Sequence, residues 1–195
     1  MVDTVSPLEP VLNRGRFANT AAQTGVVISE PAPGSIVQLA AWPDTDQKVR
    51  EAIASVLKLN LDNSPGAGAV SGHRAAFNIA PRRYLLAEED EGLAERLLSI
   101  VPADVGSVTD LSHGRTAIRI DGEKSEWILA KFFAVDFSLA RFPVGQGVST
   151  SHHDIFTQIQ RRSETTFDLY VFRSFARSFW RSLCHASEET GYEIR

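Results

Sequence analysis

The sequence predicts an α+β protein made of two similar halves, each with the order strand–helix–strand–strand–helix. Two observations lead to this prediction. Both halves contain a helix-like stripe of apolar residues, and in both a pair of strand-like segments follows at a similar offset and leads into a second helix. Antiparallel sheets with helices packed on them are the economical way to bury such elements.

Composition bounds the class of protein. The 195 residues suit one compact unit, and 43% hydrophobic and 23% charged residues are ordinary globular values. The net charge of −4 argues against a polyanion such as nucleic acid as a partner. Cys184 is the single cysteine, which excludes an internal disulfide and indicates a reducing compartment. No apolar run reaches the length of about 18 residues that a membrane span needs, and the start lacks signal-peptide features, so we expect a cytoplasmic protein.

Residues 1–24 are expected to form an N-terminal arm. They contain Pro7, Pro10 and Gly15 and show neither helical nor strand periodicity. Arg14, Arg16 and Phe17 could anchor this arm on another protein, and a mobile tail is the alternative.

The first α+β half is expected over residues 25–105. After a strand at 35–42, Asp44 and Gln47 have the spacing of a capping box that starts a helix ending near Asn60. A loop at 62–72, a hairpin at 75–87 with its turn at 81–83, and a helix at 90–100 complete this half. The apolar residues expected to face inward are Val49, Ala52, Ile53, Val56 and Leu57 in the first helix and Leu93, Leu97, Leu98 and Ile100 in the second.

The second half is expected over residues 106–195. A strand at 116–121 should place Ile118 and Ile120 on one face and Arg119 and Asp121 on the other. A helix at 123–134 and a loop around Pro143 follow, and then strands at 154–161 and 166–172. Ser174 is expected to cap a final helix that Gly191 ends.

The expected helix at 123–134 has too many apolar side chains for one buried stripe. Trp127, Ile128, Leu129, Phe132 and Phe133 spread over roughly two-thirds of the helical circumference. A surface helix of a small domain needs only one apolar stripe, so we expect a second protein chain to cover this helix.

The sequence contains no strong motif for catalysis or ligand binding. No glycine-rich nucleotide-binding signature follows a strand. Asp110, Ser112 and His113 have the residue types of a hydrolase, but adjacent side chains on an extended chain diverge. We therefore favour Asp110 and Ser112 as groups that cap backbone donors.

The remaining polar residues also favour structural roles. His152, His153 and Asp154 have metal-ligand chemistry without the spacing of one chelating face, so a polar strand start is favoured. The pairs Arg82–Arg83 and Arg161–Arg162 could meet a phosphate or a carboxylate, although cations at hairpin tips are normally solvated. His73 and His185 are isolated, and Cys184 lies on the apolar side of the last helix as inert core. We expect no catalytic, cofactor-binding or metal-binding residue on this chain.

Several segments resemble a known family. Residues 110–113, the strand 116–121 and Gly122 with its helix resemble the opening of the aminomethyltransferase fold, the folate-binding architecture of the glycine-cleavage system. The runs 142–146 (Phe-Pro-Val-Gly-Gln) and 166–176 (Thr-Phe-Asp-Leu-Tyr-Val-Phe-Arg-Ser-Phe-Ala) resemble more specifically the gamma subunit of heterotetrameric sarcosine oxidase. The motif match covers about residues 106–185, and the chain length is similar.

The resemblance implies a function that the residues alone do not. Enzymes of that family demethylate sarcosine oxidatively to glycine, reduce oxygen to hydrogen peroxide and pass the one-carbon unit to tetrahydrofolate. Their flavins (FAD and FMN) belong to the beta subunit, NAD and the folate site to the alpha subunit, and zinc to the delta subunit. The gamma subunit supplies no known catalytic group.

Two hypotheses follow. The chain is either a non-catalytic gamma subunit bound to alpha, beta and delta subunits, or a stand-alone folate-binding one-carbon protein. The first would dock through Trp127, Phe132, Phe133 and the N-terminal arm. The second needs a pocket between the halves with a carboxylate for the pteridine, for which Asp110 is the candidate.

Overall fold

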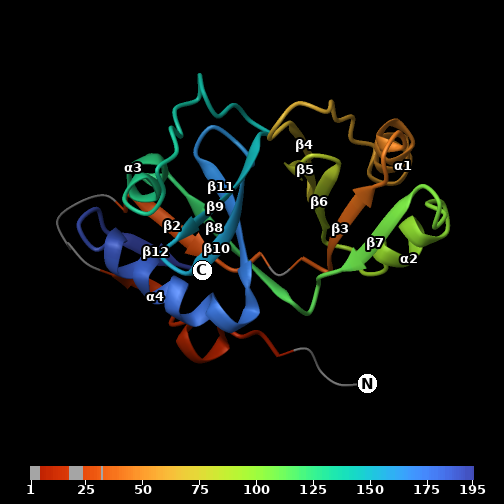
Figure 1. Ribbon diagram of the computed structural model, residues 1–195. Coiled ribbons are helices and arrows are strands. Elements are labelled where there is room, and N and C mark those ends of the chain that lie inside the picture. Colours follow the sequence, from red (N-terminus) through yellow and green to blue (C-terminus); the bar gives the residue numbers. More distant parts are fainter. Residues whose placement is uncertain (1–4, 18–23, 32) are drawn as a thin grey trace.

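The chain folds into two β-sheets that pack face to face, with helices on both outer surfaces (Figure 1). The computed structural model describes residues 5–17, 24–31 and 33–195. In Figure 1, α3 and α4 cover the left-hand sheet and α1 and α2 the right-hand one. This arrangement confirms the predicted α+β class with helices packed on largely antiparallel sheets.

The five-stranded sheet is antiparallel throughout, in the order β4-β5-β6-β3-β7. Helices α1 (Asp46–Leu57) and α2 (Leu93–Leu98) lie against its outer face. Its strands are β3 (Ser35–Ala41), β4 (Gly68–Ser71), β5 (Arg74–Ala80), β6 (Arg83–Glu88) and β7 (Gly106–Asp110).

The seven-stranded sheet has the order β1-β12-β2-β8-β11-β10-β9, and only β12 and β2 run parallel. Its outer face carries α3 (Ser125–Ala130), α4 (Ala176–Ser187) and the 3-10 turns η1 (Glu9–Val11) and η2 (Arg173–Phe175). Its strands are β1 (Gly15–Phe17), β2 (Val26–Ser29), β8 (Arg115–Asp121), β9 (Gly147–His152), β10 (Ile155–Arg161), β11 (Thr166–Phe172) and β12 (Tyr192–Ile194).

The two halves exchange their first strands. β2 precedes β3 in the chain but pairs with β8 of the other sheet, and β7 precedes β8 but pairs with β3. The expected division at residue 105 falls between α2 and β7, whereas each sheet contains strands from both sides of it. Neither sheet is therefore complete without a strand from the other half.

Apolar side chains form three clusters, one under each helical layer and one between the sheets. The cluster between the sheets includes Phe77 and Leu85 from one sheet and Ala117 and Tyr170 from the other. As predicted, Ile118 and Ile120 face the helices, while Arg119 points to the opposite face and pairs with Asp168. The inner faces of both sheets are therefore buried over much of their length.

Several helix boundaries differ from the prediction. Asp44 has a positive φ of 67° and does not cap α1, because the helix begins after Thr45, whose hydroxyl donates to the carbonyl oxygen of Val105 at 2.6 Å. The final helix begins after Phe175 rather than at Ser174. Helix α2 is shorter than expected and leaves Leu98 60% exposed, so the prediction that Leu98 faces inward was wrong, as it was for the exposed Ile100.

The N-terminal arm packs on its own chain. Leu8 is fully buried in the core beneath α4, and the guanidinium groups of Arg173 and Arg177 donate to the carbonyl oxygens of Val5 and Pro7. Phe17 stacks on Tyr192 with ring centroids 5.2 Å apart. Phe17 is therefore half-buried on its own chain, and contact of the arm with another protein stays a prediction. Residues 1–4 and 18–23 of the arm lie outside the described part of the chain.

Candidate functional site

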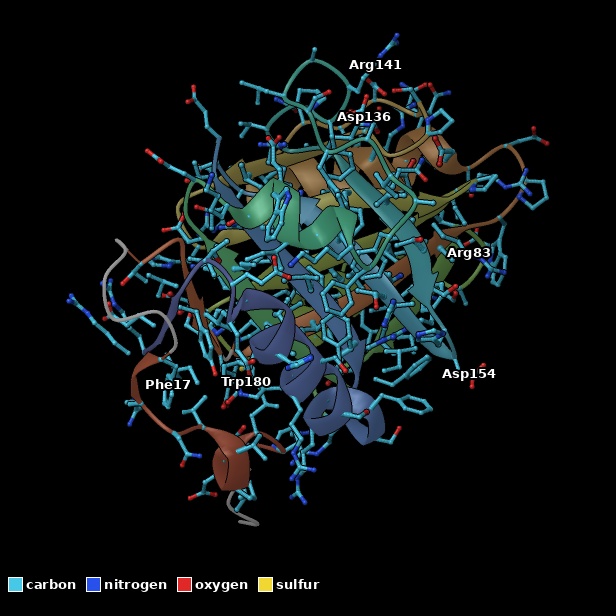
Figure 2. The ribbon with its side chains drawn as sticks, turned by 90° about the vertical axis from the view of Figure 1, so that its left-hand side faces the viewer. Phe17, Arg83, Asp136, Arg141, Asp154 and Trp180 are labelled. Atoms are coloured by element: carbon cyan, nitrogen blue, oxygen red, sulfur yellow. The ribbon has the colours of Figure 1, made fainter. Side chains whose placement is uncertain are left out.

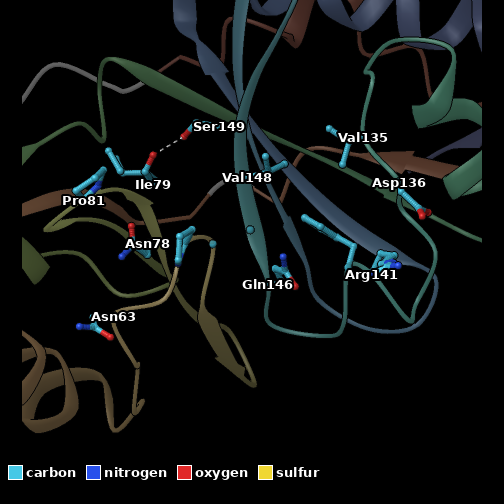
Figure 3. A pocket seen from close by; sticks show the side chains of 15 residues that line it. Asn63, Asn78, Ile79, Pro81, Val135, Asp136, Arg141, Gln146, Val148 and Ser149 are labelled. Atoms are coloured by element: carbon cyan, nitrogen blue, oxygen red, sulfur yellow. Dashed lines mark hydrogen bonds between the residues drawn. The ribbon is translucent and has the colours of Figure 1, made fainter.

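A cleft of about 610 Å³, the size of a small-molecule site, opens between the two sheets (Figure 3). One wall comes from the end of β5 and the loop before β4, and the other from the start of β9 and the loop that precedes it. The lining residues are Asn63, Pro65, Gly66, Asn78, Ile79, Ala80, Pro81, Val135, Asp136, Arg141, Phe142, Gln146, Gly147, Val148 and Ser149.

The two walls are joined by direct contacts between the sheets. The backbone N–H of Gly147 donates to the carbonyl oxygen of Gly66 at 2.8 Å. The Ser149 hydroxyl donates to the carbonyl oxygen of Ile79 at 3.0 Å, as Figure 3 shows. A Cβ atom on Gly147 would lie 2.0 Å from Cδ2 of Phe77, so the sheets come together this closely only because the side chain is absent.

The lining of the cleft contains few side chains that could take part in catalysis. Its lining contains neither histidine nor cysteine, and the Ser149 hydroxyl is used by its bond to Ile79. Asp136 and Arg141 lie together at the rim, and Asp136 accepts a hydrogen bond from the backbone N–H of Ser138 at 2.9 Å. Hydrogen bonds from Ser138 lower the pKa of Asp136, so this carboxylate stays ionised. The lining therefore provides no paired nucleophile and base.

The structure places Asp110 and Ser112 in the capping role that the sequence favoured. Asp110 accepts hydrogen bonds from the Ser112 backbone N–H at 2.8 Å and from its hydroxyl at 2.6 Å. Ser112 Oγ accepts in turn from the Ile36 N–H at 3.0 Å. His113 is exposed, and Asp110 does not line the cleft, so it cannot serve there as the pteridine-binding carboxylate.

The histidine and arginine motifs noted in the sequence lie in different parts of the molecule. His153 and Asp154 form the turn between β9 and β10, and Asp154 and Arg83 lie at outer edges of the molecule in Figure 2. His73 and His185 are exposed and face Glu89 and Glu188, respectively. Within the described ranges, no three His, Cys, Asp or Glu side chains converge on a possible metal site.

Arg161 is not a solvated hairpin cation, contrary to expectation. Its side chain is fully buried, its guanidinium pairs with Glu126 at 2.7 Å, and it donates to the carbonyl oxygens of Phe137 and Glu164. The neighbouring Arg162 reaches across to the other sheet and donates to the carbonyl oxygens of Gly72 at 2.6 Å and Arg74 at 3.1 Å. Both arginines therefore hold the fold together.

The aromatic segment expected as one helix is divided by the structure. Helix α3 ends at Ala130, and Phe133 turns into the core, where it is 3% exposed and packs near Phe137 and Phe179. Phe132 is half-buried beside Phe179 and His152. Phe133 is thus removed from the predicted docking set, because its own chain covers it. Trp127 is 46% exposed, with Lys131 Nζ 3.6 Å from its ring centroid, and remains a candidate contact.

Cys184 is expected to react slowly as a nucleophile. Burial raises the pKa of its thiol to about 11, which leaves a thiolate fraction of about one in a thousand at pH 8. Alkylation with iodoacetamide at pH 8 should therefore be roughly 100-fold slower than in the urea-unfolded chain, where the thiol regains its ordinary pKa. Mass spectrometry of timed samples gives both rates, and equal rates would contradict the assignment of Cys184 as inert core.

The exchanged-strand architecture with an inter-sheet cleft is the aminomethyltransferase type of α+β fold. The glycine-cleavage aminomethyltransferase T of Bartonella henselae matches 95% of this chain with a TM-score of 0.58 and 15% identity, and the match spans 56% of that enzyme. At this identity the likeness concerns the fold alone.

Similarity in sequence and structure also identifies a particular family. The sarcosine oxidase gamma subunit family matches residues 43–189, so the chain belongs to this family. The sarcosine oxidase subunit gamma of Corynebacterium sp. (strain U-96) is 27% identical over 88% of this chain and 84% of that protein. A chain of the heterotetrameric sarcosine oxidase from Corynebacterium sp. U-96 matches with a TM-score of 0.79 and 27% identity over 96% of both chains. These matches confirm the resemblance predicted from residues 106–185 and extend it across the first half.

Proposed function

We propose that this chain is the gamma subunit of a heterotetrameric sarcosine oxidase and that it contributes binding surface rather than catalytic groups. The observation that carries this proposal is the end-to-end fold match, over 96% of both chains, to a chain of an oxidase of that composition. A match that leaves no large segment unpaired favours a similar role in a similar assembly.

The reaction of the assembly follows from the family resemblance. Sarcosine, oxygen and tetrahydrofolate would give glycine, hydrogen peroxide and the methylene-folate product. We propose that the partner alpha, beta and delta subunits hold FAD, FMN, NAD, the folate site and zinc. The cytoplasm is the proposed compartment, a placement that the single cysteine supports. No helix in the described residues is long and apolar enough to cross a membrane.

The geometry of the cleft supports a non-catalytic role for this chain. Its one lining carboxylate, Asp136, is exposed at the rim and already accepts a hydrogen bond from Ser138. A pteridine ring needs a sheltered carboxylate for its ring nitrogens, and neither Asp136 nor Asp110 provides one. The residues of the cleft therefore do not fit the folate of the alternative hypothesis, and we derive no chemical step on this chain.

Co-expression with the other three subunits tests the proposal. The tagged chain should co-purify with three further chains, and the eluate should show flavin absorbance and produce peroxide when sarcosine is added. Light scattering should give the mass of one copy of each subunit. A colourless eluate that contains only the 21.4 kDa chain would overturn the proposed function.

A further inference from the structure

The inner face of the seven-stranded sheet extends beyond the area that the other sheet covers. Along β8 and β11, Ala117 and Tyr170 contact the five-stranded sheet. Two residues further along each strand, on the same face, lie Arg115 and Phe172, which are paired across the strands. Phe156 of β10 lies beside Phe172, with ring centroids 6.3 Å apart. We call Arg115, Phe156 and Phe172 the Arg115 patch.

Arg115 is a buried cation. The residue is only 8% exposed, and among the described residues its buried Nε and Nη1 atoms have no hydrogen-bond partner. No ion pair joins it to a carboxylate in the part of the chain that the structure describes. Burial lowers the pKa of its guanidinium, which is the effect of removing a charge from water.

Stacking compensates only part of this cost. The guanidinium carbon of Arg115 lies 3.7 Å from the ring centroid of Phe172 and 5.5 Å from that of Phe156. A cation over an aromatic face is attractive, but it leaves the N–H donors unsatisfied. A carboxylate that approached the edge of the guanidinium away from the buried Nε and Nη1 atoms would supply an opposite charge and accept a hydrogen bond.

The surroundings of Arg115 are apolar and basic. Phe156 and Phe172 remain 36% and 42% exposed despite their size. Arg173 and Arg177 follow Phe172 in the chain. Their described hydrogen bonds go to the backbone carbonyl oxygens of Val5 and Pro7 rather than to carboxylates. Exposed aromatic rings around an arginine are the composition of an interface centre rather than of ordinary surface.

We propose that the Arg115 patch docks a partner subunit of the oxidase through a segment that presents an aspartate or glutamate carboxylate between apolar side chains. The carboxylate accepts hydrogen bonds from Arg115, and its apolar neighbours cover Phe156 and Phe172. This inference rests on the proposed function, because it assigns the surface through which the chain joins the assembly. It also differs from the surface around Trp127, which lies on the helical side of the same sheet.

Competition during assembly tests this proposal. Wild-type chain and an Arg115→Met variant, carrying different tags, are co-expressed with limiting amounts of the other three subunits. The ratio of the two in the purified complex, divided by their ratio in the lysate, gives the relative affinity. We expect at least 10-fold less incorporation of R115M, because methionine keeps the apolar contact with Phe172 but offers the carboxylate no donor. Arg181→Met, on the exposed side of α4, is the matched control and should incorporate like wild type.

The thermal stability of the isolated R115M chain separates docking from folding. Its melting temperature should equal or exceed that of wild type, because the substitution removes an unpaired buried charge. If R115M proves unstable, hydrogen exchange of the wild-type chain decides the matter without a variant. Amides at 111–117 and 172–176 should exchange at least 10-fold more slowly in the complex than in the isolated chain, and unchanged exchange there would overturn the proposal.

The possible outcomes distinguish failure of the proposed function from failure of the Arg115 docking surface. If wild type fails to enter any complex, the proposed function falls and this inference falls with it. If wild type assembles and a stable R115M incorporates equally well, only the Arg115 docking surface is overturned. An Asp3→Asn variant tests whether the carboxylate that pairs with Arg115 comes from the chain's own N-terminal segment. Loss of incorporation in D3N equal to that in R115M would overturn the assignment to a partner subunit.

Discussion

Replacing Asp168 with alanine is expected to lower the free energy of unfolding by about 3 kcal/mol. Asp168 is buried between the sheets and accepts two hydrogen bonds from Arg119, at 2.7 and 2.8 Å. Arg162 approaches the same carboxylate at 3.6 Å while it donates to backbone carbonyl oxygens of the other sheet. Removing the carboxylate therefore leaves two cations uncompensated at the junction of the sheets.

Urea unfolding followed by tryptophan fluorescence measures this loss. Glu189→Ala is the control, since it removes the acid of the Lys131–Glu189 pair, which is 2.9 Å long but lies at the surface. A surface pair contributes less than about 1 kcal/mol, so this variant should unfold almost like wild type. Equal losses in the two variants would show that Asp168 does not join the sheets.

Replacing Gly147 with alanine should cost a similar amount, about 3 kcal/mol, through overpacking. The new Cβ atom would lie 2.0 Å from Cδ2 of Phe77, and Phe77 is held in the inter-sheet cluster. Because the Gly147 N–H also bonds to Gly66, the strand cannot move away without breaking that contact. The loss is measured as a shift of the urea midpoint.

A matched glycine and a double-mutant cycle make the Gly147 prediction specific. Gly114→Ala places its Cβ atom 3.6 Å from the carbonyl oxygen of Leu111, an ordinary contact, and should change stability by less than about 0.5 kcal/mol. Phe77→Leu should relieve the clash, so the G147A/F77L double variant should be more stable than the sum of the single losses predicts. Strict additivity would contradict the clash as the cause.

The local sequence pattern was sufficient to predict those helices and strands that bury one face. The apolar stripe from Val49 to Leu57 and the strand expected at 166–172 depend on near neighbours in sequence, and both elements form close to the predicted positions. Strands β4, β9 and β12 were missed. The loop expected at 62–72 contains β4, which pairs with β5. β9 is a polar edge strand, and β12 has only three residues, whose pairing with β1 and β2 depends on segments distant in the chain.

The candidate site was less predictable than the fold. The cleft combines loop residues around Asn63 with others around Asp136 and Gln146, which have no common period in the sequence. Arg161 and Arg162 appear as adjacent hairpin cations, yet Arg161 is buried over the ring of Phe167 and Arg162 bridges the sheets. For Arg115 the one available signal was a charged residue at the start of an apolar strand. This signal does not reveal that no carboxylate of the described residues pairs with it.

By itself, the sequence determined the α+β class, most of the helices and hairpins, and membership of the sarcosine oxidase gamma subunit family, because these depend on local periodicity and on contiguous motifs. Only the tertiary structure decided that β2 and β7 exchange between the sheets, that Phe133 is buried within its own chain, and that Arg115 is buried with no carboxylate of the described residues beside it. Each of these depends on which distant segments come into contact. Burial and charge pairing are properties of those contacts, and no local pattern of residues specifies them.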